Sequence, residues 1–202
     1  VIDKKNIIIA TDSKKIKTVC NNFSYKCILT SKKCLTGTDR VAEVAKKIKA
    51  KTYINLQGDE PIFNPKDIKK FLKISLENRN KILNGFSEIK NNSDYKNLNI
   101  PKLVFNNLGE LMYISRSPIP GNKNNRLVRG WKQVCIYSFP REILLKFSKT
   151  NNKSSLEKIE DIEILRFLEM GFKVKMIKLS SNSFAIDTKL DLLKLKKRLK
   201  KR

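Results

Sequence analysis

The sequence contains no histidine, and this absence removes many metal sites and acid–base sites from consideration. No two of its four cysteines, Cys20, Cys27, Cys34 and Cys135, are spaced as a Cys-x-x-Cys pair. A zinc site made of cysteine and histidine is therefore excluded. We expect four reduced thiols in or near the core, where free cysteines usually lie.

Long apolar runs are missing as well. No stretch approaches the roughly 18–20 consecutive apolar residues that a membrane span requires. There is also no basic start followed by an apolar region and a cleavage site, so nothing suggests secretion. The chain has 202 residues, 40% of them hydrophobic, and can bury a sizeable core as one domain. We predict a soluble, cytoplasmic protein without membrane insertion.

Acidic residues are scarce, because 19 Asp and Glu stand against 44 Lys and Arg, for a formal net charge of +25. Such a surface attracts polyanions. The lysines are dispersed, however, and asparagine and isoleucine are abundant too, which is typical of biased codon usage. The one concentration, at residues 189–202, has leucines at helical spacing and predicts a C-terminal amphipathic helix. We predict no nucleic-acid partner and keep a basic nucleic-acid-binding module as a distant alternative.

Short apolar runs alternate with helical patterns at the start of the chain. Strands are expected at residues 6–11, 26–30 and 52–57, and helices at residues 12–23, 37–50 and 64–78. Thr38 or Asp39 is expected to cap the second helix, and Asn64 with Pro65 to open the third. Strand–helix alternation with short connections is typical of an α/β fold with a parallel sheet.

The rest of the chain is less regular. Further strands are expected at residues 81–89, 102–107, 111–115, 131–139 and 172–179, and a Pro- and Gly-containing loop at residues 115–130. A short helix at 140–149 should have Pro140 in its first turn, and one long helix at 154–171 should end at Gly171. We predict one α/β domain over residues 1–202 with an inserted subdomain at about residues 90–150.

Two adjacent carboxylates, Asp59 and Glu60, follow the third predicted strand in the stretch NLQGDEP at residues 55–61. In open parallel sheets, ligands bind at the carboxyl ends of the strands. Gly58 permits a tight turn there, and a carboxylate held on rigid backbone suits Mg²⁺, which prefers oxygen ligands. An ordinary turn is the alternative, because Gly, Asp and Pro are also common turn residues.

A second acidic candidate, Asp187, lies in AIDTKLDLL, after the last predicted strand. If both strands belong to one parallel sheet, Asp59 and Asp187 could converge on one cation. The basic residues would then serve phosphates, and the two aspartates the metal. The alternative is that Asp187 is a helix N-cap next to Thr188.

Six blocks of the sequence resemble, in order and spacing, the 3-deoxy-manno-octulosonate (Kdo) cytidylyltransferases. The blocks are GTDRVAEVA, INLQGDEP, YISRSPIP, CIYSFPREILLKF, SLEKIEDIEILRFLEMGFKV and IDTKLDL. The resemblance implies a three-layer α/β sandwich with a mixed, mainly parallel sheet and a small inserted dimerisation or substrate subdomain. It also implies a homodimer that transfers CMP from CTP to the anomeric hydroxyl of Kdo, an acidic eight-carbon sugar, and releases pyrophosphate for lipopolysaccharide synthesis.

The resemblance further implies roles for single residues. Asp59 and Asp187 match the catalytic aspartates that bind Mg²⁺ in this family. Mg²⁺ there would hold phosphate oxygens, favour ionisation of the attacking hydroxyl and shield charge, so that no histidine base is required. The rest of the protein supplies mainly positioning and charge neutralisation.

Five further residues match substrate contacts of the family. Gln57 lies where the family contacts the sugar, Arg40 at a basic position near the nucleotide, and Arg116 where the sugar carboxylate is bound. Tyr137 and Glu163 match further positions of the sugar pocket. Taken without the resemblance, the two arginines read as ordinary surface residues, Tyr137 as a core strand residue and Glu163 as part of a solvated helix face.

The chain departs from the family pattern in three places. Gln133 replaces a sugar-pocket histidine, and Ile164 replaces the glutamine that usually follows the matching glutamate. The substrate could therefore be a modified Kdo, such as the 8-amino analogue, or a sialic-type acid sugar. The chain also starts at Val1 without the family's opening strand and Gly-rich nucleotide loop, so we expect a fragment or a truncated product.

Overall fold

The computed structural model describes residues 2–150, 152–180, 186 and 189–199. In chain order its elements are a 3-10 helix η1 (Lys4–Asn6), β1 (Ile8–Thr11), α1 (Lys14–Asn22), β2 (Lys26–Leu29), α2 (Gly37–Lys47), β3 (Thr52–Leu56), α3 (Pro65–Glu77), β4 (Ile82–Glu88), α4 (Asn92–Lys96), β5 (Lys102–Phe105), β6 (Leu111–Ser115), β7 (Trp131–Pro140), α5 (Arg141–Phe147), α6 (Ser155–Glu160), α7 (Ile164–Glu169), β8 (Val174–Lys178) and α8 (Lys189–Leu199). The strands expected from sequence are all found at the expected places.

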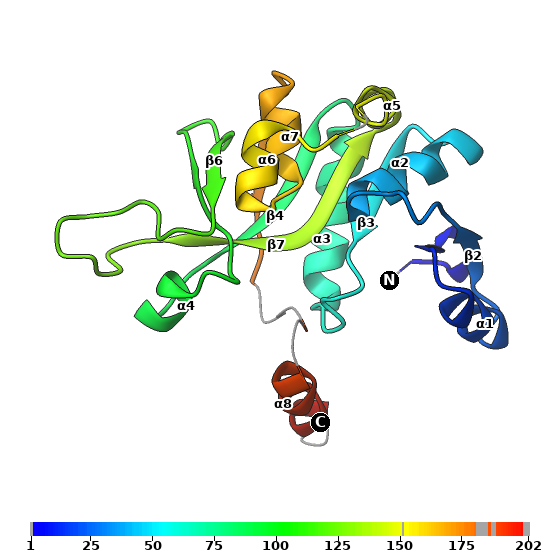
Figure 1. The fold of residues 1–202 in the computed structure, drawn as a ribbon, viewed down its shortest axis with the longest axis horizontal. Coiled ribbons are helices and arrows are strands. Elements are labelled where there is room, and N and C mark those ends of the chain that lie inside the picture. The colour runs from blue at the N-terminus through cyan, green and yellow to red at the C-terminus, as the bar shows by residue number, and fades with distance from the viewer. Residues whose placement is uncertain (1, 151, 181–185, 187–188, 200–202) are drawn as a thin grey trace.

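The long strand β7 organises a six-stranded sheet (Figure 1). Along one side it pairs antiparallel with β4, which pairs in turn with β8 in parallel. The last residues of β7 also pair antiparallel with β3, and its first residues with β5 of the β5–β6 hairpin. The sheet therefore brings the end of β3 next to the middle of β7.

The predicted mixed α/β sheet is confirmed, with a larger antiparallel share than we expected. Since β3 and β4 both run opposite to β7, they run parallel to each other and to β8. Of the six strand pairs within the described residues, however, four are antiparallel. The physical reason is that β7 lies between the parallel strands β3 and β4, and that β5 and β6 form a hairpin.

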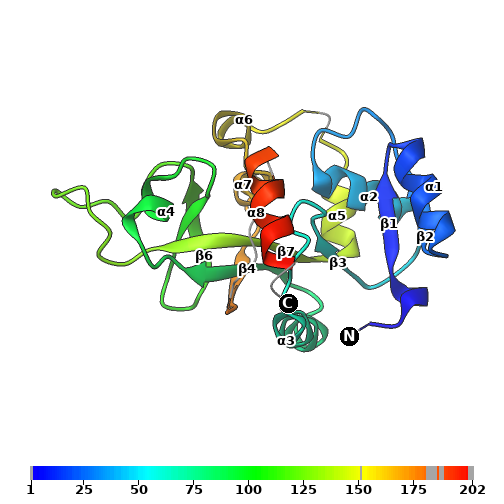
Figure 2. The ribbon, with the colours of Figure 1, turned by 90° about the horizontal axis from the view of Figure 1, so that it is seen from below.

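Helices cover both faces of this sheet, which gives the predicted three layers. Figure 2 shows α3 on one face, and α2, α5, α6 and α7 on the other. Phe71 of α3 packs against Leu83, Ile136 and other residues of the sheet in one buried cluster. A larger cluster joins α2, α5 and α7 to the opposite face of the sheet. Two separate cores thus hold the sheet between its helices.

The first two strands form a sheet of their own. β1 and β2 pair in parallel, and neither pairs with a strand of the six-stranded sheet among the described residues. Their residues are mostly only partly buried, and neither core cluster includes them. Helix α2 packs against both β1 and β3 and so links this unit to the rest.

Local capping explains where the helices begin. Helix α3 opens at Asn64, whose side chain accepts the Lys66 N–H, with Pro65 in its first turn, as predicted. For α2 the prediction was wrong, because the N-cap is Thr36, whose hydroxyl accepts the Asp39 N–H at 3.3 Å. The N-cap therefore lies two to three residues earlier than expected.

The single long helix predicted at residues 154–171 is broken into α6 and α7. Asp161 ends α6 with a left-handed backbone, φ 51° and ψ 49°. Asparagine and aspartate adopt this conformation more readily than other non-glycine residues, so the break is compatible with the sequence. The break turns Glu163 away from the line of acidic residues on α6.

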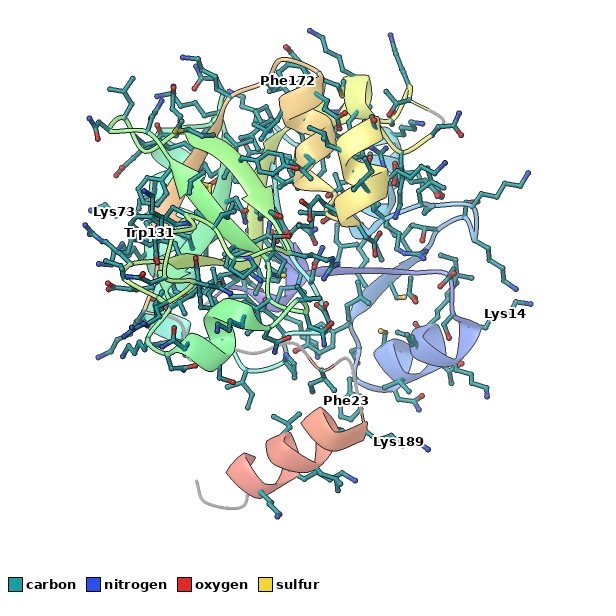
Figure 3. The ribbon with its side chains drawn as sticks, turned by 60° about the vertical axis from the view of Figure 1, so that its left-hand side comes forward. Lys14, Phe23, Lys73, Trp131, Phe172 and Lys189 are labelled. Carbon is teal, nitrogen blue, oxygen red and sulfur yellow. The ribbon has the colours of Figure 1, made fainter. Side chains whose placement is uncertain are left out.

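Positive charge is spread over the molecule. Lys14 on α1, Lys73 on α3 and Lys189 at the start of α8 lie on separate parts of the surface (Figure 3). The predicted C-terminal helix is confirmed as α8, with Leu195 buried. No helix within the described residues is long and apolar enough to cross a membrane.

Candidate active site

The turn after β3 is hydrogen-bonded to the middle of β7. The Gln57 N–H donates to the Cys135 carbonyl at 3.2 Å, and the Glu60 N–H donates to the Gln57 carbonyl at 3.3 Å. In return, the buried Glu60 carboxylate accepts the Cys135 N–H at 3.0 Å. The pairing of β4 with β7 is irregular at this point. Glu60 therefore holds the turn, and with it Asp59, on a fixed strand.

The tight turn predicted at Gly58 is present, but it does not depend on the glycine. Its backbone is not left-handed, and a Cβ added there would meet no atom within 4 Å. The turn thus does not require glycine for its conformation. Among the described residues, the space beside Gly58 is open next to Asp59.

Ile186, between β8 and α8, contacts Asp59. The Ile186 N–H donates to the Asp59 carbonyl at 2.9 Å. Asp187, the next residue and the second predicted metal ligand, lies outside the described residues. No group of three or more His, Cys, Asp and Glu side chains that could hold a metal occurs in the described part of the chain. Asp59 and Ile186, the residue before Asp187, nevertheless lie side by side.

Gln57 and Glu163 are in direct contact. The Gln57 Nε2 donates to Glu163 Oε1 at 2.6 Å, and the Thr38 N–H donates to Glu163 Oε2 at 2.9 Å. Gly37 fits closely beside them, because an added Cβ would lie 3.3 Å from Gln57 Nε2. A carboxylate can only accept, so it fixes the Gln57 amide with Nε2 toward Glu163 and Oε1 away from it. The solvated-face interpretation of Glu163 is wrong.

Burial raises the pKa of Glu163, and the negative charge of Asp39 adds to the effect, while the hydrogen bond from Thr38 opposes it.

Tyr137 is 2% exposed and stacks on Phe139, so it lies in the core of the sheet. Burial, together with the thiol of Cys135 and the charge of Glu163, holds the pKa of Tyr137 well above its usual range. Its hydroxyl therefore stays protonated near neutral pH.

Arg116 ties β6 to the α6–α7 connection. Its Nε donates to the Glu160 carbonyl at 2.6 Å, and Nη2 donates to the Asp161 carbonyl at 3.1 Å. The Glu160 carboxylate accepts the Arg116 N–H at 2.8 Å and the Ser115 hydroxyl at 2.6 Å. Arg116 is thus anchored two residues from Glu163, with its side chain about one-third exposed at 35%.

A second cation lies beneath Arg116. Lys102 is fully buried, and its ammonium donates to the carbonyls of Asn97, at 2.9 Å, and Arg116. Burial, together with the neighbouring charge of Arg116, lowers the pKa of Lys102 to about 8, against the opposing effect of the Glu160 charge. Lys102 and Arg116 thus each bind backbone carbonyl groups close to the end of β6.

The structure places Arg40 and Gln133 apart from the Gln57–Glu163 pair. Arg40 forms an ion pair with Asp12 at 3.3 Å and donates to the Thr30 hydroxyl at 2.7 Å, beside the β1–β2 unit. Gln133 donates from Nε2 to the buried Asn84 at 2.9 Å. Both are held by protein partners, and neither contacts Gln57 or Glu163 through a hydrogen bond in the described residues.

Three groups of this site were missed from sequence. They are the Thr38 N–H, the Glu60 carboxylate and the buried Arg166, which binds Asp39 and Glu157. A backbone N–H carries no side-chain signal, and Glu60 was passed over beside Asp59. The sequence could have indicated Arg166, because it follows Glu163 by three residues and residues three apart lie on the same side of a helix.

Sequence comparison adds independent information. The profile of the family described as Cytidylyltransferase matches residues 1–178. The 3-deoxy-manno-octulosonate cytidylyltransferase of Geotalea uraniireducens is 33% identical over 96% of this chain and 82% of its own length. The enzyme of the same name from Thermodesulfovibrio yellowstonii is 35% identical over 92% of this chain and 78% of its own.

Solved structures give a similar result. The structure of a CMP:2-keto-3-deoxy-manno-octonic acid synthetase complexed with CTP has a TM-score of 0.87 and 30% identity, covering 96% of this chain and 80% of the other. A putative glucose-1-phosphate thymidylyltransferase from Bacillus anthracis has a TM-score of 0.64 at 13% identity, covering 94% of this chain and 74% of the other. The second likeness shows the fold alone.

Proposed function

The chain belongs to the cytidylyltransferase family, and from this premise we propose that it transfers CMP from CTP to the anomeric hydroxyl of Kdo, with release of pyrophosphate. The product would be CMP-Kdo, the activated sugar for lipopolysaccharide synthesis. We base this proposal on one observation above the others, the likeness over nearly the whole chain to a synthetase solved with CTP. A cytoplasmic location stays a prediction.

The residues of the candidate site have the chemistry that this transfer requires. The sugar hydroxyl attacks the α-phosphorus of CTP, the new P–O bond forms, and the bond to pyrophosphate breaks. Such a reaction depends mainly on positioning and on neutralising charge. Gln57 and Glu163 present acceptor atoms that suit sugar hydroxyls, and the Gln57 Oε1 faces away from its protein partner.

For the metal, we propose that Asp59 and Asp187 would hold Mg²⁺. Supporting this, Ile186 hydrogen-bonds to Asp59, and two carboxylates are a donor set typical of Mg²⁺ with substrate phosphates. When bound, Mg²⁺ would neutralise phosphate charge and favour ionisation of the sugar hydroxyl. Glu60 would keep Asp59 in place through its hydrogen bond with Cys135.

We propose that the remaining contacts divide between the two substrates. Arg116 would bind the sugar carboxylate, because its guanidinium is a planar fork and its side chain is partly exposed beside Glu163. Arg40 would lie near the nucleotide, at the α2 end of the site. Tyr137 would support the sugar pocket from the core, and Gln133 would occupy the position of the family's histidine.

A modified Kdo is the second candidate substrate, and Gln133 is the residue that favours it. Gln133, which donates a hydrogen bond to Asn84, stands at the position where the Kdo cytidylyltransferases carry a histidine. Ile164 has no polar group in its side chain. A pocket that pairs particular hydroxyls discriminates strongly against sugars that lack them. The 8-amino analogue of Kdo and sialic-type acid sugars are therefore the substrates to compare.

We also propose a homodimer. Support comes from Leu98, Leu108, Met112 and Val128, which are 60–85% exposed at the end of the molecule formed by β5, β6 and their flanking loops. A protein–protein interface would cover such exposed apolar side chains. Light scattering should give the mass of two chains, and a mass of one chain at high protein concentration would contradict the dimer.

The test of the proposed function is pyrophosphate release with a panel of substrates. The 202-residue chain and a version extended at its N-terminus with the nucleotide loop of a relative are each given CTP, Mg²⁺ and one sugar. We expect release with Kdo and none with CTP alone. Faster release with the 8-amino analogue or a sialic-type sugar would correct the substrate. Silence with every sugar, in an extended version that binds CTP, would contradict the function.

A further inference from the structure

Arg166 is a cation inside the protein, with only 1% of its side chain exposed. Its Nε and Nη2 contact the two oxygens of the buried Glu157 at 2.5 and 2.6 Å. Its Nη1 and Nη2 contact the two oxygens of Asp39 at 3.0 and 3.3 Å. The guanidinium also lies 3.9 Å from the centre of the Phe147 ring. One side chain of α7 thus binds two carboxylates from α6 and α2.

These contacts lie directly beside the Gln57–Glu163 pair. Asp39 is in the first turn of α2, and its carboxylate also accepts the hydroxyl of the N-cap residue Thr36 at 2.7 Å. The preceding residue, Thr38, donates its N–H to Glu163. Neighbouring residues of α2 are therefore held by Arg166 of α7 and by Glu163, the N-cap of α7. These two positions are three apart, and positions three apart face the same side of a helix.

We propose that Arg166 is a positioning residue of the substrate pocket. By binding Asp39 and Glu157 together, it fixes the start of α2 against α7 and so holds Glu163 at Thr38 and Gln57. The effect of Arg166 on sugar binding rests on the proposed function. The effect of Arg166 on the Thr38–Glu163 hydrogen bond is independent of that function.

The shape of the guanidinium is essential to this role. A planar fork can bind two carboxylates with separate pairs of N–H groups, which a lysine ammonium cannot do. Arg166 also neutralises Asp39, which otherwise would face the Glu163 carboxylate with an uncompensated charge. A buried ion pair is by itself weak support for stability, so a role in holding geometry accounts better for the network.

Two variants and one control test the proposal. Arg166→Lys keeps the charge and removes the fork, and Asp39→Asn is a milder change on the other side of the same contact. Leu83→Ala is the control, because Leu83 is fully buried in the core cluster with Phe71 of α3, on the face of the sheet opposite to α2 and α7. Two quantities are measured, the rate of hydrogen exchange at the Thr38 amide and the KM for the sugar. The variants and the control are compared under conditions in which their Tm has fallen by the same amount.

We expect Arg166→Lys and Asp39→Asn to speed Thr38 exchange about tenfold and to raise the KM for the sugar about tenfold, with a smaller change in kcat. Leu83→Ala should leave both within about twofold of the parent chain. The proposal is wrong if both variants leave Thr38 exchange unchanged, or if Leu83→Ala raises the KM equally. Absence of any turnover in an extended version that binds CTP would contradict the proposed function, and the Thr38 measurement would still decide the role of Arg166.

Discussion

At the scale of single residues, the proposed chemistry depends most on Asp59. Its backbone is held from two sides, by the turn that Glu60 fixes to β7 and by the hydrogen bond from Ile186. A carboxylate on such a fixed turn can meet a cation without first losing conformational freedom. Beside it, a Cβ added at Gly58 would meet no atom of the described residues within 4 Å.

Asp59→Asn should lower turnover by at least about 100-fold at saturating substrate, because an amide binds Mg²⁺ far more weakly than a carboxylate. Pyrophosphate release measured against Mg²⁺ concentration checks this. Asp3→Asn makes the same change of charge at a residue whose side chain is 56% exposed, and should have no effect. Full turnover of a folded Asp59→Asn variant would exclude Asp59 as a metal ligand.

Lys102 gives a prediction for pH. Its pKa is about 8 in the folded chain, against an ordinary value of 10.5, mainly because of burial. Between these values the unfolded chain binds a proton that the folded chain does not, so this residue adds stability as pH rises. From pH 7.5 to 9.5, the parent chain should gain about 1–2 kcal/mol of unfolding free energy relative to Lys102→Met. Urea unfolding at both pH values measures the gain, and parallel pH profiles would contradict it.

The residue contacts could be predicted only in part. Gln57 and Glu163 were assigned to one pocket from the resemblance, and the structure brings them to 2.6 Å from each other. Their roles toward a sugar stay a prediction. Arg116 and Glu160 could not be paired in advance, because helical periodicity says nothing about partners far away in the sequence.

At the scale of elements, the break between α6 and α7 matters most for the site. It lets Glu157 point to Arg166, Glu160 to Arg116, and Glu163 to Thr38. One continuous helix would place acidic residues on a single face, as the sequence pattern suggested. The break depends on Asp161, whose left-handed backbone is uncommon in the middle of a helical pattern.

Asp161→Ala should therefore lower the unfolding free energy, and Asp161→Gly should be more stable than Asp161→Ala by about 1 kcal/mol. Both changes remove the ion pair with Lys153, so the comparison isolates the backbone. Urea unfolding of the two variants measures the difference. An equal or higher stability of the alanine variant would show that the left-handed conformation at this position costs nothing.

Element positions were more predictable than element ends. The strands and the Asn64–Pro65 start of α3 follow directly from local sequence signals. Two helix ends did not, since Thr36 rather than Thr38 or Asp39 caps α2, and Asp161 interrupts a periodic stretch. In both cases the decisive factor is a conformation or contact that apolar periodicity does not encode.

At the scale of the whole molecule, the two sheets differ in how they are supported. The six-stranded sheet is covered by buried clusters on both faces, whereas neither cluster includes a residue of β1 or β2. Local stability follows the burial of apolar contacts. Lys14, Lys73 and Lys189 lie on separate parts of the surface, so these three lysines mark no single face (Figure 3).

Amide hydrogen exchange should therefore be at least about tenfold faster in β1 and β2 than in β4 and β7, because the smaller sheet can open without disrupting the main core. Exchange followed by mass spectrometry can resolve these segments. The β3 segment serves as an internal reference, since it pairs with β7 along its whole length. Equal protection of both sheets would show that they unfold as one unit.

The central claim is the transfer of CMP to Kdo, and phosphorus NMR tests it most directly. The chain, and the version extended with a relative's nucleotide loop, are mixed with CTP, Mg²⁺ and Kdo. We predict that the triphosphate signals disappear while pyrophosphate and one new phosphodiester signal appear, because the sugar becomes bonded to the α-phosphorus. Unchanged CTP in both samples, or conversion to free CMP without a phosphodiester, would contradict the proposed transfer.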